Sequence, residues 1–201
     1  MMASDVPASV SAPAAFTAPS ATIALPGQAA SLTAPDGRVV VDLESLRISP
    51  AEGTRYRLTM GRRGSARRVT VATFGRWAEL GWAPRGHSFF LTQGLASDRS
   101  DCLVVAPRRG RMSTLSLTSV VRGQPGPLTA AERPSTSHFY LECDHWAGRH
   151  VIAGSVYGHV EAPARSFCAP FRYDVRTGHV SWGLMGGQTG ELDQSCPDDA
   201  G

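Results

Sequence analysis

The sequence predicts an all-β fold built from antiparallel meanders. Apolar and polar residues alternate with a period of two over short segments such as Arg55–Met60, which is typical of strands with one buried face. Glycine- and proline-containing turns separate these segments at short intervals. No segment of useful length shows the 3.6-residue period of an amphipathic helix, and the best candidate, Leu128–Arg133, is long enough for a single turn.

Composition predicts one domain with a mobile segment at each end. The chain has 201 residues, of which 42% are hydrophobic and 18% charged, as in an ordinary globular protein. Residues 1–29 are rich in Ala, Pro and Ser and are expected to be disordered, although the patch Ala21–Leu25 could add one edge strand. Residues 30–183 form the predicted all-β domain, and residues 184–201 a flexible, Gly-rich and acidic tail.

The positive charge is carried by arginine alone. All 20 basic residues are Arg, and the chain contains no Lys and no Asn, which indicates the coding bias of a GC-rich, bacterial genome. The densest cluster, Arg62, Arg63, Arg67 and Arg68, surrounds Gly64-Ser65 and is interpreted as the solvated tip of a hairpin. Such a tip can contact phosphate, but with a net charge of only +3 we expect no nucleic-acid partner.

The first half of the chain is expected to form a hairpin followed by a meander. Asp36-Gly37 is a tight-turn pair that precedes a β-branched run. The expected elements are a strand at Arg38–Leu43, a loop at Glu44–Glu52, strands at Arg55–Met60 and Val69–Phe74 around the exposed tip Gly61–Arg68, and a meander of Trp77–Trp82, His87–Thr92 and Cys102–Ala106.

The meander carries two further predictions. Gly86 of the Pro84-Arg85-Gly86 turn is expected to adopt a positive φ. The spacing of Trp82, Phe90, Leu103 and Val105 predicts that these four side chains share one core face.

The second half is expected to contain more strands around a linker at Gly123–Pro134, which carries Pro125, Gly126, Pro127 and Pro134. The expected strands are Met112–Val121, His138–Cys143, Arg149–Tyr157, Ser166–Val175 and His179–Trp182.

A weak internal repeat links the turns. Ala-Pro-Asp-Gly37, Ala-Pro-Arg-Gly86 and Trp-Ala-Gly148 each precede a strand, and in each unit further strands follow. Four-stranded units of about 40–50 residues are typical of propeller blades. Trp82-Ala-Pro-Arg-Gly86 resembles the Trp-Ser-Pro-Asp-Gly turn of the TolB-type (WD-like) β-propeller repeat, with Ala83 and Arg85 in place of the usual Ser and Asp. Tyr173–Gly178 resembles the Tyr-Asp-x-x-Thr-Gly turn between the last two strands of such blades.

The resemblance implies about three propeller-blade-like sheets between residues 31 and 183. Three blades are too few to close a ring, so a partial propeller, an open stack of sheets and a β-sandwich remain alternatives. Members of the family mostly bind proteins or small ligands, and many are exported, which favours a periplasmic or secreted location. The chain as given shows no signal peptide, and it has no run of about 18 apolar residues that could span a membrane.

Four cysteines permit three disulfide pairings. Cys102 opens an apolar strand and is interpreted as a small buried residue. Cys143 and Cys168 are the expected pair if the protein is exported, and Cys196 in the tail is expected to be free.

Two places hold the candidate ligand-binding residues. Asp98 and Asp101 lie in a polar loop between strands, where they either bind a ligand or close an Asx turn. His145 and Trp146 follow Cys143, but Cys143, His145 and His150 supply too few ligands for a metal site. Neither a metal nor a cofactor is expected.

The predicted function is that of a non-enzymatic β-propeller-like binding or scaffold protein with a protein or small-molecule partner. The alternative is a small hydrolase with a site between the sheets. The chain lacks the Gly-x-Ser-x-Gly pattern, so a Ser–His–Asp site would have to be assembled from dispersed residues. Convergence of His, Asp and Ser or Cys in one cleft would distinguish the two.

Overall fold

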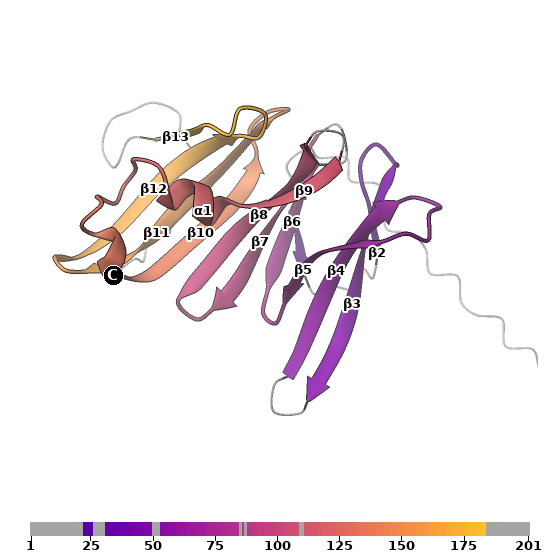
Figure 1. The fold of residues 1–201 in the computed structure, drawn as a ribbon, viewed down its shortest axis with the longest axis horizontal. Helices are drawn as coiled ribbons and strands as arrows, with labels where there is room; N and C mark the ends of the chain where they lie inside the picture. Colours follow the sequence, from indigo (N-terminus) through magenta and orange to yellow (C-terminus); the bar gives the residue numbers. More distant parts are fainter. Residues whose placement is uncertain are drawn as a thin grey trace, which may run out of the picture.

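The computed structural model describes residues 22–25, 31–49, 53–84, 86, 88–108 and 111–183. Over these residues the chain is predominantly β, with antiparallel sheets, as the sequence predicts. It forms three meanders of four strands, one after another along the chain (Figure 1). Residues 1–21 of the expected disordered lead and the whole tail 184–201 lie outside the described residues.

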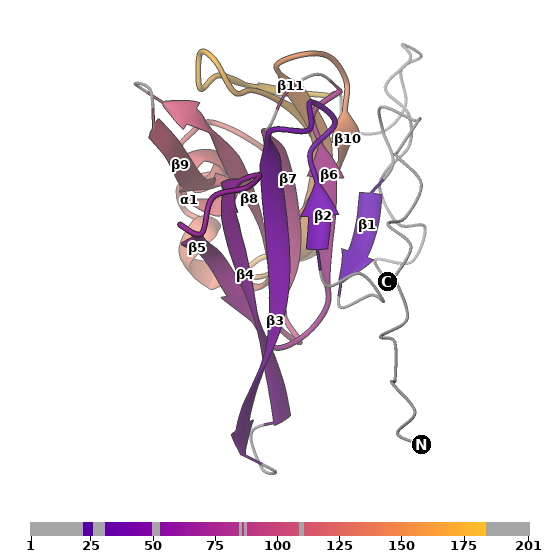
Figure 2. The ribbon, with the colours of Figure 1, turned by 90° about the vertical axis from the view of Figure 1, so that its right-hand side faces the viewer.

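The first meander is a separate sheet with the strand order β2-β3-β4-β5. Its strands are β2 (Ser31–Thr33), β3 (Val39–Ser49), β4 (Gly53–Arg62) and β5 (Val69–Phe74). The predicted pairing of β4 with β5 around an arginine-rich tip is confirmed. The loop expected at Glu44–Glu52 is wrong over residues 44–49, because these belong to β3, which continues with β4 as a long two-stranded ribbon (Figure 2). Residues 50–52 lie outside the described residues. Glu44 lies opposite Arg57 there, and this cross-strand ion pair (2.6 Å) favours the extended hairpin.

The second meander follows the order β6-β7-β8-β9. Its strands are β6 (Ala78–Trp82), β7 (Phe89–Ala96), β8 (Arg99–Arg108) and β9 (Arg111–Ser116), which confirms the predicted central meander. Strand β1 (Thr22–Leu25) pairs with the outer side of β6, so the apolar patch near residue 23 does add an edge strand.

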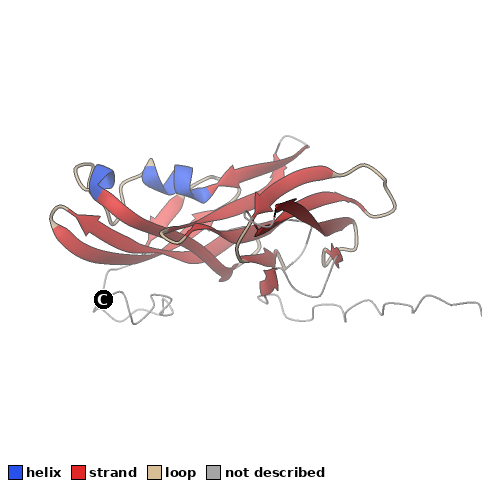
Figure 3. Cartoon of the chain, turned by 90° about the horizontal axis from the view of Figure 1, so that it is seen from below, coloured by secondary structure: helices blue, strands red, loops and turns tan. Residues whose placement is uncertain are grey.

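The third meander is β10-β11-β12-β13. Its strands are β10 (Thr136–Trp146), β11 (Val151–Glu161), β12 (Ala164–Asp174) and β13 (Val180–Trp182). The connection from β9 contains α1 (Leu117–Arg122) and the 3-10 turn η1 (Arg133–Ser135), which lie on one face of the sheet (Figure 3). The strand expected to reach Val121 is therefore wrong beyond Ser116. Leu117 and Val121, four residues apart, are both buried, so core packing favours one short helix here.

Strand β10 joins the third meander to the second. It pairs in parallel with β8 at Phe139 and Arg99 and so extends the sheet to nine strands. Further along, side-chain hydroxyls replace strand pairing: Ser100 Oγ accepts from the Leu141 N–H (3.0 Å) and donates to the Leu141 carbonyl (3.3 Å). Thr92 Oγ1 does the same at Cys143. The buried backbone of β10 is thereby satisfied without a full ladder.

Two hydrophobic cores lie on opposite faces of the second meander. One core is shared with the first meander and contains Leu58, Leu80 and Phe89. The other is shared with the third meander and α1 and contains Phe90, Leu141 and Ile152. The second meander is therefore covered on both faces.

This arrangement corrects the predicted core face. Trp82, Phe90 and Val105 are buried, but Phe90 belongs to the other core. Trp82, Phe89 and Val105 lie opposite one another across β6, β7 and β8, so Phe89 is the residue that shares a face with Trp82. Their rings meet edge to face at 5.0 Å. Leu103 is only half-buried and packs against the same core.

The cysteine pairing also differs from the prediction. Cys102 on β8 is bonded to Cys143 on β10, across the junction of the second and third meanders. The predicted Cys143–Cys168 bond is wrong, because Cys143 faces the core while Cys168 lies opposite Tyr157 on the other face of β12. Cys168 is disulfide-bonded too. Cys196, which was expected to be free, lies outside the described residues.

The repeated turns occupy equivalent places in the three meanders. Gly37, Gly86 and Gly148 each lie between the first and second strands of their units: β2 and β3, β6 and β7, and β10 and β11. Gly37 and Gly86 have φ of 71° and 124°, which confirms the prediction for Gly86. Gly178 (φ 76°) lies between β12 and β13, the last two strands of the third unit. The two sheets do not close into a ring.

Candidate functional site: an arginine-rimmed groove

The four residues predicted to bind a ligand do not come together. Asp98 lies in the turn between β7 and β8, where its carbonyl accepts from the Phe139 N–H (3.1 Å) at the start of β10. His145 and Trp146 lie at the far end of β10. Seven residues of strand separate Phe139 from Trp146, which is roughly 20 Å.

Two of the four, Asp101 and Trp146, have clear structural roles. Asp101 is 6% exposed, and its Oδ1 accepts from both the backbone N–H (3.1 Å) and the hydroxyl (2.7 Å) of Thr118 in α1. The buried indole N–H of Trp146 donates to the Gly81 carbonyl (2.9 Å). Asp98 makes only a long ion pair with Arg99 (3.6 Å). His145 is half-buried, beside an irregularity in the β10–β11 register.

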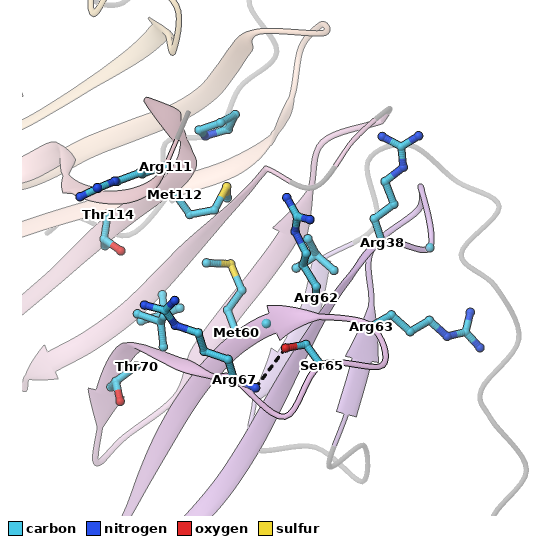
Figure 4. Close-up of a pocket in the computed structure, with 16 residues that line it drawn as sticks. Arg38, Met60, Arg62, Arg63, Ser65, Arg67, Thr70, Arg111, Met112 and Thr114 are labelled. Atoms are coloured by element: carbon cyan, nitrogen blue, oxygen red, sulfur yellow. Dashed lines mark hydrogen bonds between the residues drawn. The ribbon is translucent and has the colours of Figure 1, made fainter. Parts of the chain in front are cut away.

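A larger feature lies between the first and second meanders. A groove of about 1260 Å³ is bounded by the turns and strand ends of β3, β4 and β5 on one side and by β8 and β9 on the other (Figure 4). We call it the arginine groove, and its lining residues are Gly37, Arg38, Val39, Met60, Gly61, Arg62, Arg63, Ser65, Arg67, Val69, Thr70, Val71, Pro107, Arg111, Met112 and Thr114.

The rim of the arginine groove carries positive charge only. Five of its lining residues are arginines (Arg38, Arg62, Arg63, Arg67 and Arg111), and none of the described lining residues is acidic. Arg62, Arg67 and Arg111 are arranged around the two methionines in Figure 4. Guanidinium groups bind carboxylates and phosphates through paired N–H donors, so the rim is suited to an anion.

The floor of the groove is apolar. Met60 and Met112 face each other from the two meanders, and Val69 and Pro107 extend this surface. Val69 is 56% exposed, so this part of the apolar surface is open to solvent. Methionine side chains adapt to ligands of different shape. The groove therefore combines a charged rim with an adaptable apolar floor.

Local hydrogen bonds hold the tip between β4 and β5 in place. Gly64 takes φ 78°, and the Ser65 N–H donates to the Arg62 carbonyl (3.0 Å) while the Ser65 hydroxyl accepts from the Arg67 N–H (3.1 Å). Arg68 folds back and donates to the Ser65 carbonyl. The exposed arginines at residues 62, 63 and 67 thus extend from an ordered turn, as the sequence predicts for the tip.

Arg68 is kept out of the rim by an acid behind it. Its Nε donates to Asp42 Oδ2 (2.6 Å) on β3. Burial acts to raise the pKa of Asp42, but the hydrogen bonds from Arg68 and from the Ser31 hydroxyl outweigh it and hold that pKa below its usual value. The charges of Asp42 and Arg68 thus compensate each other, and the charges of the other tip arginines remain available to a ligand.

Sequence reasoning identified part of this site. The cluster at residues 62–68 is visible in the sequence, although it predicts only a solvated tip. Arg38 lies 24 residues before Arg62 and Arg111 lies 44 residues after Arg67, so no sequence signal joins them to the cluster. Only the packing of the first meander against the second brings them to one groove.

The groove offers few groups for catalysis. Its described lining includes the hydroxyls of Ser65, Thr70 and Thr114 but no imidazole, thiol or carboxylate. Over the described part of the chain, no three His, Cys, Asp or Glu residues are grouped so that they could hold a metal ion. No helix among the described residues has the length and apolar character needed to cross a membrane.

Comparisons with known proteins add little to this geometry. No protein-family model matches the chain, and no curated protein matches it. One solved structure, the AtxE2 isopeptidase in its apo form, matches 77% of this chain with a TM-score of 0.41 and 12% sequence identity. The matched part is 28% of that protein, so this chain spans just over a quarter of its length.

Proposed function

We propose that this protein is a non-enzymatic binding module, built from three blade-like β-meanders, that binds an anionic partner in the arginine groove. The observation that carries the proposal is that five arginines from three separate turns line one groove, with Arg62, Arg67 and Arg111 nearest its apolar floor. Like charges repel one another, so an anion bound among these arginines would relieve part of their repulsion.

The arrangement of the chain supports the blade-like part of the proposal. Each meander has four antiparallel strands, and the repeated glycine turn has the same place in each. The TolB-type resemblance implies the same organisation, with a protein or small ligand as the partner. The alternative of a small hydrolase needs a base and a nucleophile in one cleft, and the described lining of the groove supplies hydroxyls without a base.

The test is a binding measurement with a matched charge control. The probe is a fluorescent twelve-residue peptide of alternating Glu and Thr, titrated by anisotropy. The variant Arg62→Ser/Arg67→Ser/Arg111→Ser removes three charges from the groove. The control variant Arg149→Ser/Arg172→Ser/Arg176→Ser removes three charges from exposed positions of the third meander.

We expect the groove variant to bind at least about 10-fold more weakly than the parent, because charge-assisted hydrogen bonds are lost. The control variant should bind within about twofold of the parent, and both affinities should fall with added salt. Equal losses in the two variants would show that net charge, rather than the groove, attracts the peptide and would contradict the proposal.

A further inference from the structure

A free strand edge lines the arginine groove. Strand β9 is the last strand of the second meander, and in the described part of the chain it pairs with β8 on one side only. Its residues Arg111, Met112 and Thr114 line the groove. An unpaired strand edge exposes backbone N–H and C=O groups in a row, which can pair with another extended chain.

The other edge strands of the described fold are short or irregular. Strands β1, β2 and β13 have four, three and three residues. Strand β5 has six residues, but its pairing with β4 shifts register so that Val71 is left without an opposite residue. Short edges and bulges are the usual means by which proteins prevent strand addition.

Strand β9 departs from that pattern. All six of its residues pair with β8 in one unbroken register, from Arg108↔Arg111 to Leu103↔Ser116. It contains no proline, and Arg111, at its first position, is its one charged residue. Among the strands that end the described sheets (β1, β2, β5, β9 and β13), β9 is thus the one that combines six residues with a regular register. In the described part of the chain, the outer sides of β3 beyond Asp42 and of β12 before Phe171 are also open, but these stretches do not line the arginine groove.

The charges around β9 define which chain can add to it. Arg111 begins the strand, and Arg62 and Arg67 face it across the groove (Figure 4). A second copy of this protein pairing through the same edge would bring two such arginine groups together, which is unfavourable. A strand with acidic side chains would be attracted instead.

A nucleic acid fits the site less well than a peptide. Proteins that bind single strands commonly stack the bases on aromatic side chains. None of the described residues that line the groove is aromatic. The methionines and valines of the floor offer apolar contacts suited to the alternate side chains of an extended peptide.

We infer that an extended acidic peptide segment of a partner protein binds the arginine groove by adding as a strand to the free edge of β9. This inference rests on the proposed function and names its partner. Backbone hydrogen bonds to β9 supply part of the affinity, and the arginines select acidic side chains.

The experiment separates strand pairing from charge attraction. The Glu-Thr peptide is compared with two versions that carry N-methyl groups on the odd or on the even residues, which remove backbone N–H donors without changing charge. Only one set of N–H groups can face β9, because successive residues of a strand direct their N–H groups to opposite edges. We expect one N-methylated peptide to bind about 10-fold or more weakly and the other to bind like the parent.

Two further readouts locate the peptide. Hydrogen exchange measured by mass spectrometry should slow at residues 111–116 on peptide binding and stay unchanged at residues 151–161, which form β11, a strand paired on both sides. Thr114 is exposed, so Thr114→Asp should fold and repel the acidic peptide, whereas Thr114→Asn should bind it like the parent.

The outcomes distinguish this inference from the proposed function. If the arginine variant loses binding while both N-methylated peptides bind like the unmethylated peptide, the proposed binding in the groove is supported and strand addition to β9 is wrong. If the arginine variant binds normally, the proposed function fails. Two other results would contradict an acidic peptide as the partner. One is that a twelve-nucleotide single strand binds more tightly than the Glu-Thr peptide. The other is that the protein forms dimers without peptide and that Thr114→Asp abolishes them.

Discussion

Two aspartates three residues apart differ sharply in their surroundings. Asp101 is buried and accepts two hydrogen bonds from Thr118, whereas Asp98 is half-exposed and has one long ion pair. We predict that Asp101→Ala lowers the free energy of unfolding by about 1–3 kcal/mol, because two donors at the start of α1 lose their acceptor. Asp98→Ala should change it by less than about 0.5 kcal/mol. Urea unfolding of both variants checks this, and similar losses would contradict it.

Glu132 is predicted to make the fold sensitive to acid. Its carboxylate accepts from Arg165 Nε (2.7 Å) and from the N–H (2.8 Å) and hydroxyl (2.9 Å) of Thr129. The hydrogen bond from Arg165, followed by those from Thr129, lowers the pKa of Glu132 from 4.5 to about 2. Its stabilising effect is complete above the unfolded-state pKa and is lost as pH falls towards 2. Glu132→Gln should therefore flatten the decline of melting temperature between about pH 5 and pH 2.

Glu142 is predicted to change stability with pH in the opposite direction to Glu132. Burial, together with the nearby charge of Glu79, raises the pKa of Glu142, although the hydrogen bond from the Tyr157 hydroxyl (2.8 Å) acts to lower it. A raised folded-state pKa means that stability decreases as pH rises through it. Glu142→Gln should thus raise the melting temperature at about pH 7, with a gain that shrinks on acidification. Parallel slopes for Glu132→Gln and Glu142→Gln would show that neither carboxylate controls the acid response.

At the scale of elements, the junction of β8 with β10 concentrates unusual contacts. The strands pair at Phe139 and Arg99, and beyond this point the hydroxyls of Ser100 and Thr92 bond to the backbone of β10. The Cys102–Cys143 disulfide spans the same junction. Parallel neighbours need a long connection, here α1 and the segment up to η1, so this junction cannot form locally.

The disulfide should therefore make a large contribution to stability. Its cysteines are 41 residues apart, which corresponds to about 4 kcal/mol in the chain-entropy description. We predict that Cys102→Ala/Cys143→Ala lowers the free energy of unfolding by about this amount. Urea unfolding gives the value, and peptide mapping under non-reducing conditions should recover residues 102 and 143 in one linked fragment. A fragment that links residues 143 and 168 would contradict this pairing.

At the scale of the whole molecule, the second meander organises the fold. Its two faces contribute to two different cores, one shared with the first meander and one with the third. The arginine groove lies where the first of these interfaces opens towards the tips of β3–β5 and β9. A site between two sheets depends on how they pack, so the groove is a property of the assembled fold rather than of one element.

The sequence by itself determined the strands and most turns. Period-two alternation and tight-turn glycines act over a few residues, so they predict the hairpin of β4 and β5, the meander β6–β8 and the positive φ of Gly86. The placement of Gly37, Gly86 and Gly148 in equivalent turns is also visible in the sequence. Local prediction was wrong where tertiary contacts outweigh local preference, as in α1 and the ribbon beyond Leu43.

Only the tertiary structure decided which faces and which distant residues meet. Alternation shows that Phe89 and Phe90 point to opposite faces, but both faces of the second meander are buried, so it cannot assign either ring to a core. The partner of Cys143 and the gathering of Arg38, Arg62 and Arg111 depend on contacts between separate meanders. Local periodicity carries no information about such contacts, because they arise from sheet packing.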